Sequence, residues 1–125
     1  MSRFVAYLAL LLLLGGCGDP SKPSKQAERV CQRLSQHLRQ AESSEELQEL
    51  QLELKRDFCE MAELLIELDR KRALGEQLPP LSSRVLEELR EELERVYSLE
   101  EGREIIERAQ GEALRRLDRA VSRYR

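Results

Sequence analysis

Apolar residues recur every three or four positions along most of the chain after residue 25, which is the spacing of one face of an amphipathic helix. The first segment predicts a helix that runs from an N-cap at Ser24 to about Ala41. One face of this helix would carry Ala27, Val30, Leu34, Leu38 and Ala41. No segment alternates with a period of two, so the pattern indicates an all-α fold.

The second segment predicts a long helix that opens with a capping box at Ser43 and Glu46 and ends near Leu74, before Gly75. Its main apolar face consists of Leu47, Leu50, Leu54, Phe58, Met61, Leu65 and Leu68. A second, narrower stripe consists of Leu52, Cys59, Ala62, Ile66 and Ala73. Because a helix with two apolar faces packs between neighbours, we expect this helix to be the central element.

Pro79 and Pro80 interrupt the pattern, because proline cannot continue a helix interior. A third helix is expected from Ser82 or Ser83. Its seam would be Leu86, Leu89, Leu93 and Val96. A second capping-box match, at Ser98 and Glu101, predicts the start of a fourth helix. That helix would place on one face Ile106, Ala109, Ala113, Leu117, Ala120 and Tyr124.

The alternative for the last part of the chain is one bent helix over residues 83–124. Whether residues 83–124 form one helix or two, the sequence predicts a small antiparallel bundle of three to four helices over residues 26–125. The helix of residues 43–74 would lie at its centre.

The N-terminal segment follows a different pattern. Arg3 precedes an apolar run from Phe4 to Leu14, and Gly15 and Gly16 follow. One positive charge, a short apolar run and small residues are typical of a secretory signal peptide, whereas a transmembrane helix needs about 20 apolar residues. We therefore expect residues 1–16 to be removed by cleavage.

The junction Leu14-Gly15-Gly16-Cys17 resembles the lipobox of bacterial lipoproteins. The resemblance implies that Cys17 becomes the first residue of the mature protein and carries a thioether-linked diacylglycerol and an N-acyl chain. Several acyl chains anchor a protein stably, whereas one chain binds a membrane only marginally. The alternative is an ordinary signal peptide with a chance cysteine beside its cleavage point.

Residues 17–25 would then form a lipidated cysteine and a flexible tether, because they contain Pro20 and Pro23 among small and polar residues. Gly18 favours the outer membrane by resemblance to Gram-negative sorting patterns. Asp19 leaves the inner membrane as the alternative.

The two remaining cysteines, Cys31 and Cys59, form an even pair in an exported, oxidising compartment. They lie at equal distances from residue 45, within the expected connection between the first two helices, and so would be level in an antiparallel hairpin. We therefore predict a structural disulfide between them. Two free thiols, or pairing between molecules, are the alternatives.

Charge and composition narrow the function. Loss of Arg3 with the signal peptide changes the formal net charge from −3 to −4, which argues against a nucleic-acid partner. His37 is the only histidine, and zinc sites offer three or four closely spaced ligands, so neither a metal nor another cofactor is expected. No acid, base and nucleophile converge, which favours a non-catalytic protein.

The C-terminal helix carries a stripe of Arg116, Arg119 and Arg123 beside its apolar face. Complementing the helix dipole is one explanation of these charges. The other is contact with an anionic group, such as lipid head groups or an acidic partner.

Taken with the lipobox resemblance, these features predict a lipid-anchored, periplasm-facing protein of the bacterial envelope that binds another envelope protein as an assembly accessory factor. A groove between the third and fourth helices would accept the partner's helix. The alternatives are a structural lipoprotein that self-associates into a homo-oligomer, and an exclusion or immunity lipoprotein.

Overall fold

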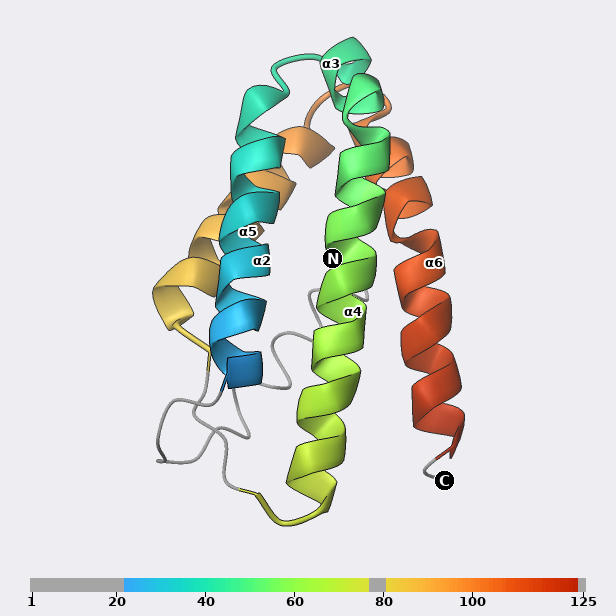
Figure 1. Cartoon of the computed structure of the whole chain (residues 1–125). Coiled ribbons are helices and arrows are strands. Elements are labelled where there is room, and N and C mark those ends of the chain that lie inside the picture. The colour runs from blue at the N-terminus through green and yellow to red at the C-terminus, as the bar shows by residue number, and fades with distance from the viewer. Residues whose placement is uncertain (1–21, 77–80, 124–125) are drawn as a thin grey trace.

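The computed structural model describes residues 22–76 and 81–123, which form five helices and no strand. The helices are α2 (Lys22–Gln40), α3 (Ser44–Glu49), α4 (Gln51–Ala73), α5 (Ser83–Tyr97) and α6 (Gly102–Arg123). The predicted all-α bundle is therefore confirmed (Figure 1).

α2 begins two residues before the predicted N-cap at Ser24. Pro23 is compatible with this start, because the first N–H groups of a helix have no intrahelical partner. Residues 22–25 are thus helical, and the expectation of a flexible tether as far as Lys25 is wrong for them. The predicted apolar face is confirmed, since all five of its residues are buried.

The long helix expected over residues 43–74 is divided at Leu50 into α3 and α4. The predicted cap forms, because the Ser43 hydroxyl accepts a hydrogen bond from the Glu46 N–H at 3.2 Å. The break turns α3 over the end of the bundle, where Leu47 is fully buried (Figure 1). At the other end Gly75 adopts a φ of 88°, and its N–H and that of Glu76 bond to the last carbonyls of α4.

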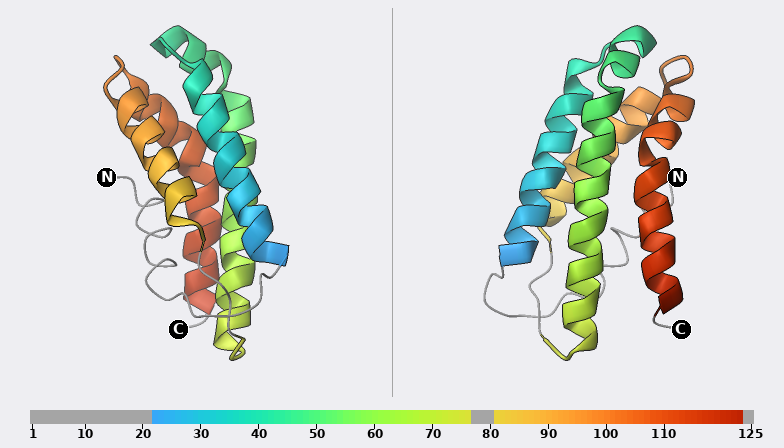
Figure 2. Two further views of the ribbon diagram at one scale, coloured as in Figure 1. Left: turned by 90° about the vertical axis from the view of Figure 1, so that its left-hand side faces the viewer. Right: turned by 45° about the vertical axis from the view of Figure 1, so that its right-hand side comes forward.

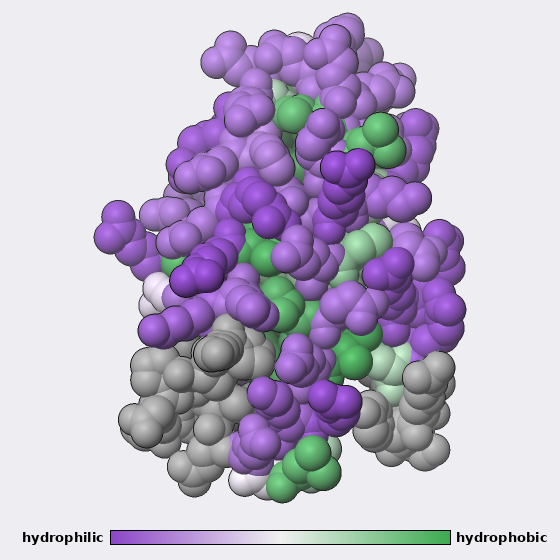
Figure 3. Space-filling view, in the orientation of Figure 1, coloured by the Kyte–Doolittle hydropathy of each residue, from purple (hydrophilic) through white to green (hydrophobic). Residues whose placement is uncertain are grey.

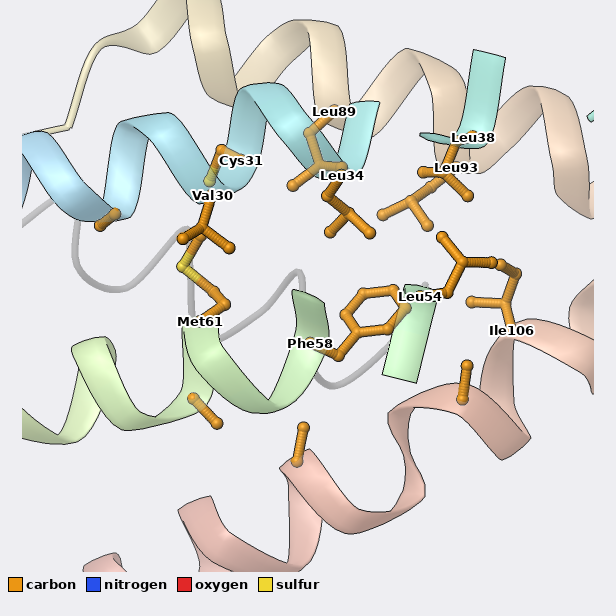
Figure 4. Packing of buried hydrophobic residues seen from close by; sticks show 14 of the residues in the cluster. Val30, Cys31, Leu34, Leu38, Leu54, Phe58, Met61, Leu89, Leu93 and Ile106 are labelled. Atoms are coloured by element: carbon orange, nitrogen blue, oxygen red, sulfur yellow. The ribbon is translucent and has the colours of Figure 1, made fainter. Parts of the chain in front are cut away.

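α4 packs between α2 and α6, as predicted for the central element (Figure 1). Its main apolar face supplies the middle of the core, where Phe58 and Met61 are fully buried, and Met61 points toward Val30 of α2 (Figure 4). The narrower stripe is only partly covered. Ala62 is buried, whereas 71% of Leu52 is exposed.

Contacts far apart in the sequence define the direction of neighbouring helices. Arg95 of α5 donates to the carbonyls of Leu38 and Ala41, and the N–H of Ser82 donates to Glu28, so α5 runs parallel to α2. α6 likewise runs parallel to α4 (Figure 2). Consecutive helices remain antiparallel, but the chain crosses the bundle between α4 and α5.

Residues 98–101 separate α5 from α6, so the alternative of one bent helix does not apply. The predicted capping box at Ser98 and Glu101 is wrong, because the Ser98 hydroxyl donates instead to the Arg95 carbonyl and ends α5. Glu101 has a φ of 60°, a left-handed conformation that redirects the chain, and α6 begins at Gly102. A Cβ atom at Gly102 would lie 1.9 Å from the Val96 carbonyl oxygen.

Replacement of Gly102 by alanine should therefore destabilise the fold by about 2 kcal/mol or more, because the opposing atom belongs to the backbone and cannot rotate away. Gly111→Ala is the matched control, since a Cβ there would come no closer than 4.0 Å to a neighbour, the flexible Arg115 side chain, and should stabilise the helix by about 0.5–1 kcal/mol. Urea unfolding measures both values. Equal effects of the two substitutions would contradict the close approach.

Candidate functional site

The predicted lipidation residue, Cys17, lies outside the described residues, as do the rest of the lipobox and the signal peptide. α2 begins five residues after Cys17. The lipid anchor therefore stays a prediction, and the helical domain would begin directly beside it.

Cys31 and Cys59 are free thiols in the structure, so the predicted disulfide is wrong. Cys31 is fully buried in α2, and Cys59 is partly buried in α4. Burial, with a smaller effect from the neighbouring Glu28, raises the pKa of the Cys31 thiol to about 12. A thiol with that pKa stays protonated at neutral pH and is a poor nucleophile.

The disulfide prediction fails because Cys59 lies on the wrong face of α4, although the two cysteines are level along the helices. They are level because Asp57, two residues before Cys59, contacts Arg33, two residues after Cys31. At 100° per residue, however, Asp57 and Cys59 lie nearly opposite each other around α4. Cys59 faces α6, where the pKa of Arg116 is raised chiefly by its electrostatic interaction with the deprotonated form of Cys59. Cys59 thus points away from the helix that carries Cys31.

The most unusual polar group of the core is the carboxylate of Asp57, which is only 2% exposed. Arg33 Nε donates to Asp57 Oδ1 at 2.8 Å, and His37 Nδ1 donates to Asp57 Oδ2 at 2.5 Å. A second carboxylate, Glu60, also accepts from Arg33 and is the main cause of its raised pKa. Both oxygens of the buried carboxylate are therefore satisfied by donors from α2.

The sequence contained a signal for this cluster that the helical pattern did not reveal. Asp57 falls between Leu54, Phe58 and Met61 on the buried side of its helix, where an unpaired carboxylate would be costly. The hairpin register that suggested the disulfide also places Arg33 level with Asp57 and His37 about one helical turn away. His37 is only partly buried, with 24% of its side chain exposed.

A shallow pocket of about 290 Å³ opens beside this cluster. Its lining residues are Arg33, His37, Glu53, Arg56, Asp57 and Glu60. Because a carboxylate only accepts, the bond to Asp57 leaves the proton of neutral His37 on Nδ1 and a lone pair on Nε2. Such a His–Asp pair needs a hydroxyl or thiol in reach for nucleophilic catalysis, and none is among the lining residues.

The predicted arginine stripe is already engaged within the chain. Arg116 donates to Glu63 of α4 at 3.0 Å and to Glu112 at 3.4 Å, and Arg119 approaches Glu112 at 3.5 Å. The side chain of Arg123 lies outside the described residues. An anionic contact would therefore have to compete with these ion pairs at Arg116, while Arg119 keeps 66% of its side chain exposed.

Arg95 of α5 makes contacts with a segment far from it in the sequence. Arg95 pairs with Glu92 at 3.0 Å and donates to the carbonyls of Leu38 and Ala41 at 2.6 and 2.9 Å. It thus satisfies the carbonyl of Ala41, just after α2, and shares the carbonyl of Leu38 with the Ala41 N–H.

Within residues 22–76 and 81–123, no helix is long and apolar enough to cross a membrane, and no group of three or more His, Cys, Asp or Glu residues could hold a metal ion. The described residues thus define an all-α bundle with a buried ion cluster between α2 and α4. Comparison of the chain with protein-family models, with curated proteins and with solved structures gives no match.

The thiols give one test of the site. In a Cys17→Ser variant, which leaves two cysteines, maleimide should modify one thiol per folded molecule, at Cys59, because Cys31 is buried and protonated. Both thiols should react after unfolding in urea. Cys59→Ala in the same background should abolish the native reaction. A disulfide would instead leave both thiols unreactive in urea until a reductant is added.

The ion cluster gives a second test. Asp57→Ala should lower the free energy of unfolding by about 2 to 3 kcal/mol, because it leaves Arg33 and His37 without their buried acceptor. Asp69→Ala, at an exposed position of the same helix, should change stability by less than about 0.5 kcal/mol. Equal losses in the two variants, measured by urea unfolding, would contradict a structural role for the cluster.

Proposed function

We propose that this chain is a lipid-anchored, non-catalytic protein of the bacterial envelope that binds another envelope protein as an accessory or assembly factor. The observation that carries the proposal is the Leu14-Gly15-Gly16-Cys17 junction, placed five residues before the start of a helical bundle. The outer membrane is the favoured location, because Gly18 follows the cysteine.

The arrangement of the ion cluster supports a non-catalytic role. Both oxygens of Asp57 are occupied by donors from a neighbouring helix, so its charge ties α2 to α4 and is not presented to a substrate. The pocket beside it is shallow, whereas sites for small molecules are usually enclosed and mostly apolar.

The packing of the last two helices supports a binding surface between them. α5 packs mainly on α2, and α6 packs mainly on α4, so these two helices contact each other only sparsely. Their axes separate with distance from the connection at residues 98–101 (Figure 2). We assign the partner's helix to the surface between α5 and α6.

Lipidation and partner binding can be tested in one set of envelope preparations. The wild-type chain should fractionate with membranes and carry the mass of a diacylglycerol and an acyl chain on Cys17. A Cys17→Ser variant should lack that mass, because serine has no thiol to form the thioether. Mass spectrometry of the N-terminal peptide distinguishes the two.

Crosslinking of the same envelopes should recover one or more proteins reproducibly with the lipidated chain. Failure to recover any partner would contradict the accessory role. A stable oligomer of the purified chain, without a second protein, would instead favour self-association. Wild-type chain without the lipid mass would contradict the anchor itself.

A further inference from the structure

Acidic residues gather at one end of the bundle. This distal end comprises residues 38–53 and 92–106, which lie at the same level because Arg95 contacts the end of α2. It contains ten Asp and Glu residues against three Lys and Arg. All three of those cations are already paired, Arg95 and Arg39 with Glu92 and Arg103 with Glu107.

The opposite end differs both in charge and in exposed apolar surface. α4 extends beyond the first turn of α2 there, and its tip, residues 70–74, contains three basic residues and no acidic one (Figure 1). No described acidic side chain lies within ion-pair distance of Arg70 or Arg72, while Lys71 pairs only loosely with Glu67, at 3.9 Å. Leu74, two residues after Arg72, is 74% exposed.

The helix dipole accounts for only part of this pattern. Cations at the C-terminus of α4 complement its dipole, but the first turn of α2 lies at the same end and contains no acidic residue. Lys25 and Arg29, near the start of α2, are exposed and have no acidic partner among the described side chains. The helix dipole also gives no reason for the exposed leucine, Leu74, that lies near these cations.

This basic end is the one beside the predicted anchor. Cys17 precedes Lys22 by five residues, which span at most about 18 Å when fully extended. The charged face of α2, α4 and α6 is hydrophilic over most of its area, with apolar residues mainly in strips between helices (Figure 3). A lipid surface close to Cys17 would therefore meet the tip of α4 before it meets the acidic end.

We propose that the tip of α4, with Arg70, Arg72 and Leu74, rests on anionic lipid head groups, so that the bundle stands on the membrane with its acidic end outward. Arginine side chains bind phosphate groups by paired hydrogen bonds, and Leu74 enters the apolar boundary below them. The negative surface repels the distal end and thereby fixes the orientation. This inference rests on the lipid anchor of the proposed function.

The orientation is measured by energy transfer to acceptor-labelled lipids. The lipidated mature chain, with Cys59→Ala to remove its accessible thiol, receives a donor dye at Ala73→Cys or Leu52→Cys. Both positions are exposed, and they lie about 32 Å apart along α4. In vesicles of phosphatidylethanolamine and phosphatidylglycerol, transfer from position 73 should exceed transfer from position 52.

The difference should be lost in phosphatidylcholine vesicles and in 1 M salt, where the screening length falls to about 3 Å. It should also be lost in Arg70→Glu/Arg72→Glu. The matched control is Lys55→Glu/Arg56→Glu, which makes the same charge change at exposed positions of the same helix and should keep the difference.

Equal transfer from the two positions on phosphatidylglycerol vesicles would overturn the proposal, as would equal effects of the two charge-reversal variants. If the orientation forms only in native envelope membranes, the proposal of lipid binding is also wrong. The tip of α4 would then bind an acidic protein. In each of these outcomes the lipid mass on Cys17 remains, so the proposed anchor survives. Absence of that mass overturns both.

Discussion

The register between α2 and α4 depends on the buried carboxylate of Asp57, because Arg33 and His37 reach it only when the two helices are level. The surrounding core is aliphatic except for Phe58, and Leu, Ile and Val side chains tolerate small sliding movements. A charge pair does not, because a displaced partner leaves a buried charge unsatisfied. α5 then packs on α2 and α6 packs on α4, so both later helices rest on the pair of helices that this ion cluster joins.

Periodicity predicted the helices well, since the apolar faces of Leu34, Phe58, Leu89 and Ile106 all became core. Sequence pattern failed where the same residue can take part in two local structures. Ser98 can cap the helix before it or the helix after it, and the sequence spacing does not distinguish these two roles. The two cysteines show a related limit of sequence-based prediction. Equal distance from a turn indicates that two residues are level in a hairpin, but it does not indicate which face of its helix each residue occupies. Cys59 is level with its expected partner and points elsewhere.

The candidate site shows that an analysis of hydrophobic periodicity does not detect buried charged residues. Asp57 was overlooked because a single charge on an apolar face contributes nothing to a hydrophobic period, although its burial makes it the most constrained side chain of the hairpin. Arg95 is a second example of an undetected contact, because it donates to the backbone carbonyls of Leu38 and Ala41, more than fifty residues away. Long side chains at helix boundaries take such partners only after tertiary packing, which no local pattern contains.

The parallel pairing of α2 with α5 and of α4 with α6 has a consequence for the way the chain folds. Each pair joins segments about fifty residues apart, so the polypeptide must close two long, overlapping loops before either contact forms. An α2–α4 hairpin alone leaves the side of α4 that contacts α6 in water, including the fully buried Ala62. Among the described helices α6 therefore completes the core, and a fragment that ends before α6 leaves this side of α4 uncovered.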